Sequence, residues 1–119
     1  MRDLIMDVSE TSRTKLFRRA AIAGVTLGIL VNVVAVPLAI GSMGAGHGDY
    51  FWTNMCFPFL MLIAGIVGRI PMTLAWLSLL QYPMYGYLVG NSSAKLRTAA
   101  GILLAHAAIA TASFVWRFD

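Results

Sequence analysis

Apolar residues dominate four stretches of the chain, and polar residues gather between them. The stretches are about 18 to 22 residues long, close to the ~20 residues with which a helix crosses ~30 Å of hydrocarbon. Their sequences contain no Asp, Glu, Lys or Arg. The pattern predicts an all-α fold, a polytopic transmembrane four-helix bundle, with spans at about 20–41, 51–68, 71–89 and 99–116.

The second and third stretches are joined almost directly, through Arg69 and Ile70. So short a connection predicts two antiparallel spans that form a transmembrane hairpin. Pro58 lies early in the second stretch and Pro71 opens the third, and both are positions where a missing N–H is tolerated. Aromatic rings favour the headgroup level of a bilayer. Two groups of them therefore predict belts at the outer interface, residues 50–52 and the tyrosines Tyr82, Tyr85 and Tyr87.

The N-terminal residues 1–19 form the only extended polar segment, and its basic residues lead directly into the first apolar stretch. That stretch is too long for the apolar region of a typical signal peptide. Lys and Arg beside spans favour the cytoplasmic side. We therefore expect a cytoplasmic basic segment at 1–19, a four-span domain at 20–119, and both termini in the cytoplasm.

Counting Lys and Arg supports this orientation by seven to two. Two basic residues of the 90–98 loop, Lys95 and Arg97, fall outside in it and count against it. An alternative has three spans, with residues 52–90 not crossing the membrane fully twice. The seven residues that the four-span arrangement places inside are Arg2, Arg13, Lys15, Arg18, Arg19, Arg69 and Arg117.

Composition agrees with lipid as the main solvent. Hydrophobic residues make up 59% and charged residues 12% of the 119 residues, whereas soluble domains have roughly 25% charged residues. The net charge of +4 is explained by basic residues beside the spans, so we expect no nucleic-acid partner. The single cysteine, Cys56, excludes an intrachain disulfide.

Three polar residues lie near the middle of predicted spans: Asn32 in the first, Gln81 in the third and His106 in the fourth. Side chains of this kind form hydrogen bonds between helices in lipid. One interpretation is that they fix which helices pair. The other is a polar midplane cluster that forms a small site for a proton, a quinone or another ligand.

The two histidines are candidate ligands, because imidazole binds haem iron and other metals. The only other histidine, His47, shares a glycine-rich loop with Asp49 that we expect to be solvated. A haem ligand at His106 would need a methionine or another chain as its partner. We therefore expect no metal and no cofactor.

Small residues recur four apart in two of the stretches, at Gly24 and Gly28 and again at Gly101 and Ala105. This spacing places them on one helical face and lets another backbone approach closely. These faces predict helix contacts, either within the bundle or with another chain.

No combination of nucleophile and base occurs in the apolar stretches, so we do not expect an enzyme. The prediction is a small non-catalytic integral membrane protein, an accessory or structural subunit of a larger membrane complex or a homo-oligomer. Its expected partners are the bilayer and other membrane subunits or its own copies, in a bacterial inner membrane. The alternative is a small dimeric transporter or channel whose path is lined by Asn32, Gln81 and His106.

Overall fold

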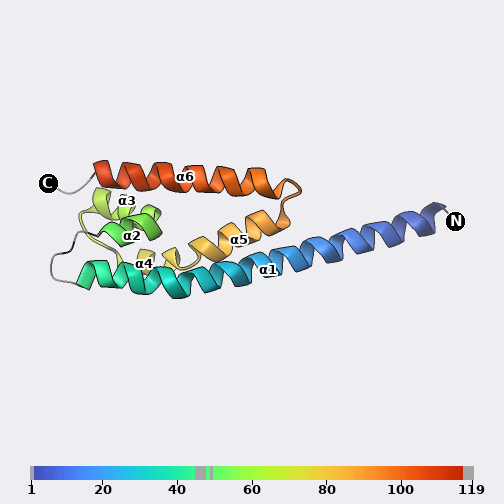
Figure 1. The fold of residues 1–119 in the computed structure, drawn as a ribbon, viewed down its shortest axis with the longest axis horizontal. Coiled ribbons are helices and arrows are strands. Elements are labelled where there is room, and N and C mark those ends of the chain that lie inside the picture. The colour runs from blue at the N-terminus through green and yellow to red at the C-terminus, as the bar shows by residue number, and fades with distance from the viewer. Residues whose placement is uncertain (1, 45–47, 49, 117–119) are drawn as a thin grey trace.

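The computed structural model describes residues 2–44, 48 and 50–116, without the side chains of residues 2–9 and 11. His47, Asp49 and Arg117 lie outside this part of the chain. All regular secondary structure in the described part is helical (Figure 1), which confirms the all-α class. The helices are α1 (Arg2–Gly44), α2 (Phe51–Cys56), α3 (Pro58–Val67), α4 (Met72–Ser78), α5 (Gln81–Asn91) and α6 (Lys95–Val115).

The first helix, α1, sets the length of the molecule. Its 43 residues span about 65 Å at 1.5 Å per residue, close to the longest dimension of 69 Å. It joins the predicted polar segment and the first apolar stretch into one element. Its N-terminal part extends beyond the other helices (Figure 1).

The predicted single helix over 51–68 is wrong, because the chain breaks into α2 and α3 at Phe57. Phe57 has φ −130° and ψ 60°, and a residue before proline is disfavoured in helical geometry. Pro58 therefore opens a new helix, α3, instead of lying early in an existing one.

Helices α2 and α3 fold back on each other as a short helical hairpin. The Phe51 ring lies 5.8 Å from that of Phe114, near the end of α6. A Cβ added at Gly65 would lie 3.2 Å from the carbonyl oxygen of Trp116, at the same end. Between Phe51 and Gly65 in the sequence, Met55 contacts His106, which lies about two turns before Phe114 in α6. The start of α2 and the end of α3 thus both lie beside the C-terminal end of α6, and the turn between them lies about two turns further back.

The predicted third span also contains a break, between α4 and α5. Leu79 and Leu80 keep right-handed backbone angles, but their N–H groups bond three residues back, to Trp76 and Leu77. The two helices follow one another, and α5 runs antiparallel to α1. Helix α6 then returns antiparallel to α5, so α1 begins and α6 ends at opposite ends of the long axis (Figure 1).

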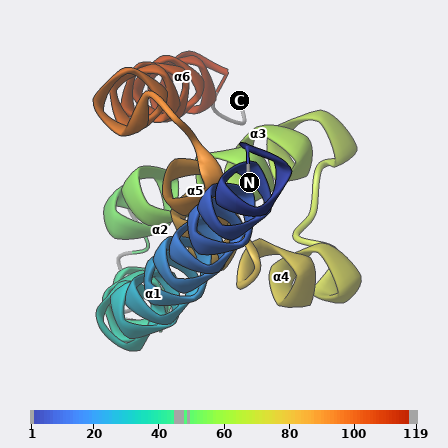
Figure 2. The ribbon, with the colours of Figure 1, turned by 90° about the vertical axis from the view of Figure 1, so that its right-hand side faces the viewer.

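Viewed along this axis, α5 lies at the centre, with α6 on one side and α1 on the other (Figure 2). The hydrophobic core is small and lies near the α2–α3 hairpin, around Ala35, Ala39, Cys56, Phe57 and Leu60. Large apolar side chains cover the outside. Within the described residues, two helical stretches are long and apolar enough to cross a membrane, Ser12–Gly44 and Lys95–Val115.

Candidate functional site

Glycines bring two backbones into direct contact at the α1–α5 interface. A Cβ added at Gly24 would overlap the main chain of Gly86, and one at Gly28 would overlap that of Tyr82. Gly90 meets Ala20 in the same way. The structure thus places Gly24 and Gly28 against α5, with backbones in direct contact. The matching spacing of Tyr82, Gly86 and Gly90, four residues apart, is the sequence signal for this face of α5.

Asn32 bonds the main chain at the α4–α5 junction. Its Nδ2 donates to the carbonyl oxygen of Leu79 at 2.6 Å. In a continuous helix this oxygen would accept from residue 83, four positions on. Residue 83 is proline and has no N–H to give. Asn32 therefore replaces a helix bond that Pro83 removes.

Gln81 bonds the main chain at the break between α2 and α3. Its Nε2 donates to the carbonyl oxygen of Cys56 at 3.0 Å, and the Tyr82 hydroxyl donates to the same oxygen at 2.7 Å. The last carbonyls of a helix have no partner within it. Two neighbouring side chains of α5 thus satisfy the end of α2.

His106, on α6, also donates a hydrogen bond to a main-chain carbonyl near the end of α2. Its Nε2 lies 2.7 Å from the carbonyl oxygen of Met55. A carbonyl oxygen only accepts, so Nε2 is the donor, and in the neutral ring Nδ1 is then an acceptor. The Tyr85 hydroxyl lies 3.4 Å from Nδ1 and donates to it.

The three predicted cluster residues therefore occupy one region but use their hydrogen-bonding nitrogens on separate main-chain carbonyls. Asn32, Gln81 and His106 bond to Leu79, Cys56 and Met55 respectively, all at helix breaks. The Tyr82 hydroxyl bonds the Cys56 carbonyl oxygen and the Tyr85 hydroxyl bonds His106, so both tyrosines make hydrogen bonds between helices.

Asn54 was not singled out from the sequence, yet its side chain is only 1% exposed. Neither its Nδ2 nor its Oδ1 has a hydrogen-bond partner in the described part of the chain, and the same holds for Oδ1 of Asn32 and Oε1 of Gln81. Such groups are costly to bury. They make the interior polar where α1, α2 and α5 meet.

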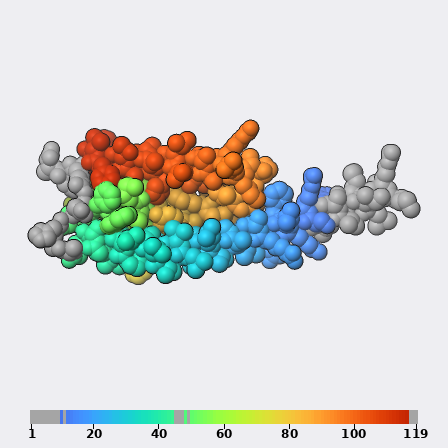
Figure 3. Space-filling view, viewed as in Figure 1, coloured from blue at the N-terminus to red at the C-terminus, as the bar shows by residue number. Residues whose placement is uncertain are grey.

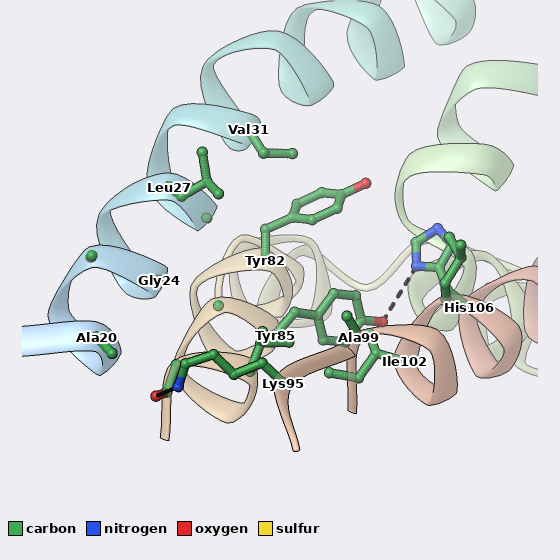
Figure 4. A pocket seen from close by; sticks show the side chains of 16 residues that line it. Ala20, Gly24, Leu27, Val31, Tyr82, Tyr85, Lys95, Ala99, Ile102 and His106 are labelled. Atoms are coloured by element: carbon green, nitrogen blue, oxygen red, sulfur yellow. Dashed lines mark hydrogen bonds between the residues drawn. The ribbon is translucent and has the colours of Figure 1, made fainter. Parts of the chain in front are cut away.

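A groove of about 550 Å³ runs between α1 and α6, with α5 as its floor (Figure 4). We call it the α1–α6 groove. Lys95 lies at one end and the Tyr85–His106 pair at the other, and aliphatic side chains and glycines line the rest. The lining residues labelled in Figure 4 are Ala20, Gly24, Leu27, Val31, Tyr82, Tyr85, Lys95, Ala99, Ile102 and His106.

The second pair of predicted packing residues faces outwards. A Cβ added at Gly101 would meet nothing within 4 Å, and Ala105 is exposed. Ala108, one turn further on, is exposed as well. We call Gly101, Ala105 and Ala108 the small-residue face of α6. At 100° per residue, it is centred about 140° around the helix from the face that lines the α1–α6 groove.

No group of three or more His, Cys, Asp or Glu side chains suited to hold a metal ion occurs among the residues that the structure describes. The Tyr85–His106 pair has the groups for a proton exchange. The Nε2 of His106 already bonds the Met55 carbonyl oxygen, however, and the pair borders an apolar groove.

Comparison with known protein families, curated proteins and solved structures finds no match to this chain.

Proposed function

We propose that this chain is a non-catalytic integral membrane protein that acts as a small subunit of a membrane complex or as a homo-oligomer, in a bacterial inner membrane. The observation behind the proposal is the use of Asn32, Gln81 and His106. Each donates to a main-chain carbonyl that a helix break leaves free. Polar groups used in this way give hydrogen-bond partners to the main-chain carbonyls at helix breaks, where lipid offers none. A transport path would need the same groups for a passing ion.

The proposed membrane arrangement has three crossings and one re-entrant hairpin. The crossings are α1, the α4–α5 pair and α6. Residues 72–91 of the α4–α5 pair measure about 30 Å if helical throughout, which matches the hydrocarbon thickness. The α2–α3 hairpin would enter and leave on one side. Non-helical backbone at membrane depth must be buried in protein, and Phe57 at the turn is only 3% exposed.

This arrangement puts the α5–α6 turn on the cytoplasmic side, together with the basic residues of α1. Its support is a contact: the Lys95 ammonium lies 5.8 Å from the centre of the Phe17 ring. Lys95 and Arg97 then join the basic N-terminal segment, and the count of Lys and Arg stays seven to two. The end of α6 would lie on the outer side, unlike the expected cytoplasmic C-terminus.

Association would use the small-residue face of α6. Only 11% of the most apolar stretch of this helix is buried, and small residues let a second helix approach closely. The face points away from the groove, so a partner there would leave the rest of the bundle unchanged.

The test is Ala105→Phe, with Ala100→Phe as the control, because Ala100 is exposed on the same helix but lies on another face. Native mass and in-membrane cross-linking measure association. We expect Ala105→Phe to weaken association about tenfold, or roughly 1.4 kcal/mol, and Ala100→Phe to leave it unchanged. A wild-type monomer without co-purifying chains would contradict the proposal.

A further inference from the structure

The α1–α6 groove has a length that suits one leaflet of a bilayer. It extends along α1 from Ala20 to Val31, which is about 16 Å at 1.5 Å per residue. Half of the ~30 Å hydrocarbon core is ~15 Å. The groove begins at the end of the bundle where the basic residues lie, so it would run from the headgroup level to the bilayer midplane.

At its inner end the groove leaves α6, and a second hollow that shares Val31 and Tyr82 continues along α1 as far as Leu38. Helix α2 lies between α1 and α6 beyond this point, and His106 is bonded to Met55 there. In the space-filling view, α2 fills the band between α1 and α6 in which α5 is visible further along (Figure 3). A transmembrane helix from another chain would have to continue through this position, whereas a lipid chain of one leaflet ends at it.

The volume of the groove also argues against a partner helix as its occupant. One turn of helix, about 10 Å across and 5.4 Å long, occupies on the order of 400 Å³. The groove of about 550 Å³ holds the volume of little more than one turn although it is about three turns long, so it is too narrow for a partner helix. It is open along its side, and Leu27 and Leu103 on its walls are 63% and 69% exposed.

The outer end of the groove is cationic. The Lys95 ammonium donates to the carbonyl oxygens of Gly90 at 3.0 Å and Ser92 at 3.1 Å. An ammonium has three N–H donors, so one donor is left over from these two hydrogen bonds, and the Phe17 ring also lies close by, 5.8 Å from the nitrogen. Arg97 and Arg18 are exposed at the same end of the bundle. This charge complements a phosphate at the headgroup level.

We propose that the α1–α6 groove binds one acyl chain of an anionic phospholipid, with the lipid phosphate at Lys95. The glycines of the α1–α5 interface form the floor under the chain, and Ala23 and Ala99 leave room for it on the two walls. This inference rests on the membrane arrangement proposed above, and it adds a ligand that the subunit function does not require.

The experiment uses the full-length protein, delipidated in detergent and titrated with phosphatidylglycerol or phosphatidylcholine in native mass spectrometry. We expect the wild-type protein to bind phosphatidylglycerol about tenfold more tightly than phosphatidylcholine. Ala99→Phe should fill the groove and weaken binding of both lipids about tenfold. Ala100→Phe, on an exposed face outside the groove, should bind like the wild type. Lys95→Gln should reduce the preference but keep the binding of the chain, because Arg18 and Arg97 remain at this end.

A second variant, Ala23→Phe, fills the groove from the α1 wall and repeats the test if Ala99→Phe does not fold. Equal binding of the two lipids by the wild type would overturn the proposal, and so would equal effects of Ala99→Phe and Ala100→Phe. A cross-link between cysteines placed at residue 99 of two chains would assign the groove to a second copy. Extraction with alkaline carbonate measures membrane insertion separately, and Ala105→Phe reports on association, so failure of the proposed function is recognised independently.

Discussion

Individual polar residues in this protein act on the main chain of other helices. Main-chain carbonyls in lipid need a donor, because no water is present to supply one. Asn32, Gln81 and His106 supply donors across 47, 25 and 51 residues of sequence. Their role is therefore tied to particular breaks, and it can be tested by removing the break as well as the side chain.

A double-mutant cycle between Asn32 and Pro83 tests this role. Asn32→Leu removes the donor to the Leu79 carbonyl and should lower the free energy of unfolding by about 1 kcal/mol. In a Pro83→Ala background the N–H of residue 83 can bond this carbonyl, so the same change should cost clearly less. Unfolding in detergent micelles measures the four variants.

The cycle has a clear contrary result. If Asn32→Leu costs the same with proline or alanine at position 83, the asparagine does not compensate for the proline. Ser42 gives a reference, because its hydroxyl bonds Ala39 and Thr53, away from this break. Ser42→Ala should not couple to Pro83.

At the scale of helices, the α1–α5 interface brings two backbones into direct contact and depends on residues without side chains. The predicted Gly24 and Gly28 face meets Gly86 and the main chain of Tyr82. Asn32 and Leu79 extend the same interface by one turn. Close packing of backbones is a main source of helix association in lipid, so this interface should be sensitive to a single added methyl group.

Gly24→Ala and Gly41→Ala on α1 form a matched pair. An added Cβ at position 24 overlaps the backbone of Gly86, and one at position 41 meets nothing within 4 Å. We expect Gly24→Ala to lower the free energy of unfolding by about 1–3 kcal/mol. Gly41→Ala should leave it unchanged or raise it by up to about 1 kcal/mol, through better helix propensity. Equal effects in the two variants would mean that α1 and α5 are not in backbone contact.

For the whole molecule, the path of residues 51–67 decides the topology. A continuous helix there would give four crossings with both termini on one side. A hairpin that returns to its own side gives three crossings with the termini on opposite sides. The two arrangements differ in the side on which Arg69 and Ser93 lie.

Cysteine accessibility distinguishes the two arrangements. In a Cys56→Ala background, single cysteines are introduced by Ser12→Cys, Gly48→Cys, Arg69→Cys and Ser93→Cys. With three crossings, an impermeant maleimide should label positions 48 and 69 in intact spheroplasts and positions 12 and 93 only after lysis. Four crossings would instead pair 48 with 93, and 12 with 69, which would refute the re-entrant hairpin.

Local pattern gave a good account of where helices form. Positions 20–41 lie within α1 and positions 99–115 within α6, because hydropathy and helix length are properties of contiguous residues. The pattern failed at Pro58. A proline at this point fits either the first turn of a span or the start of a second helix, and the residues around it do not distinguish the two.

The sequence by itself therefore determined the all-α class, the apolar helices and the basic end of the molecule, since these follow from composition within each stretch. Only the tertiary structure decided where the chain turns back and what Asn32, Gln81 and His106 bond. The break at Phe57 leaves carbonyls without partners, and the donors that satisfy them come from α5 and α6, 25 to 51 residues away. Their positions depend on which helices are neighbours, and no single stretch of sequence contains that information.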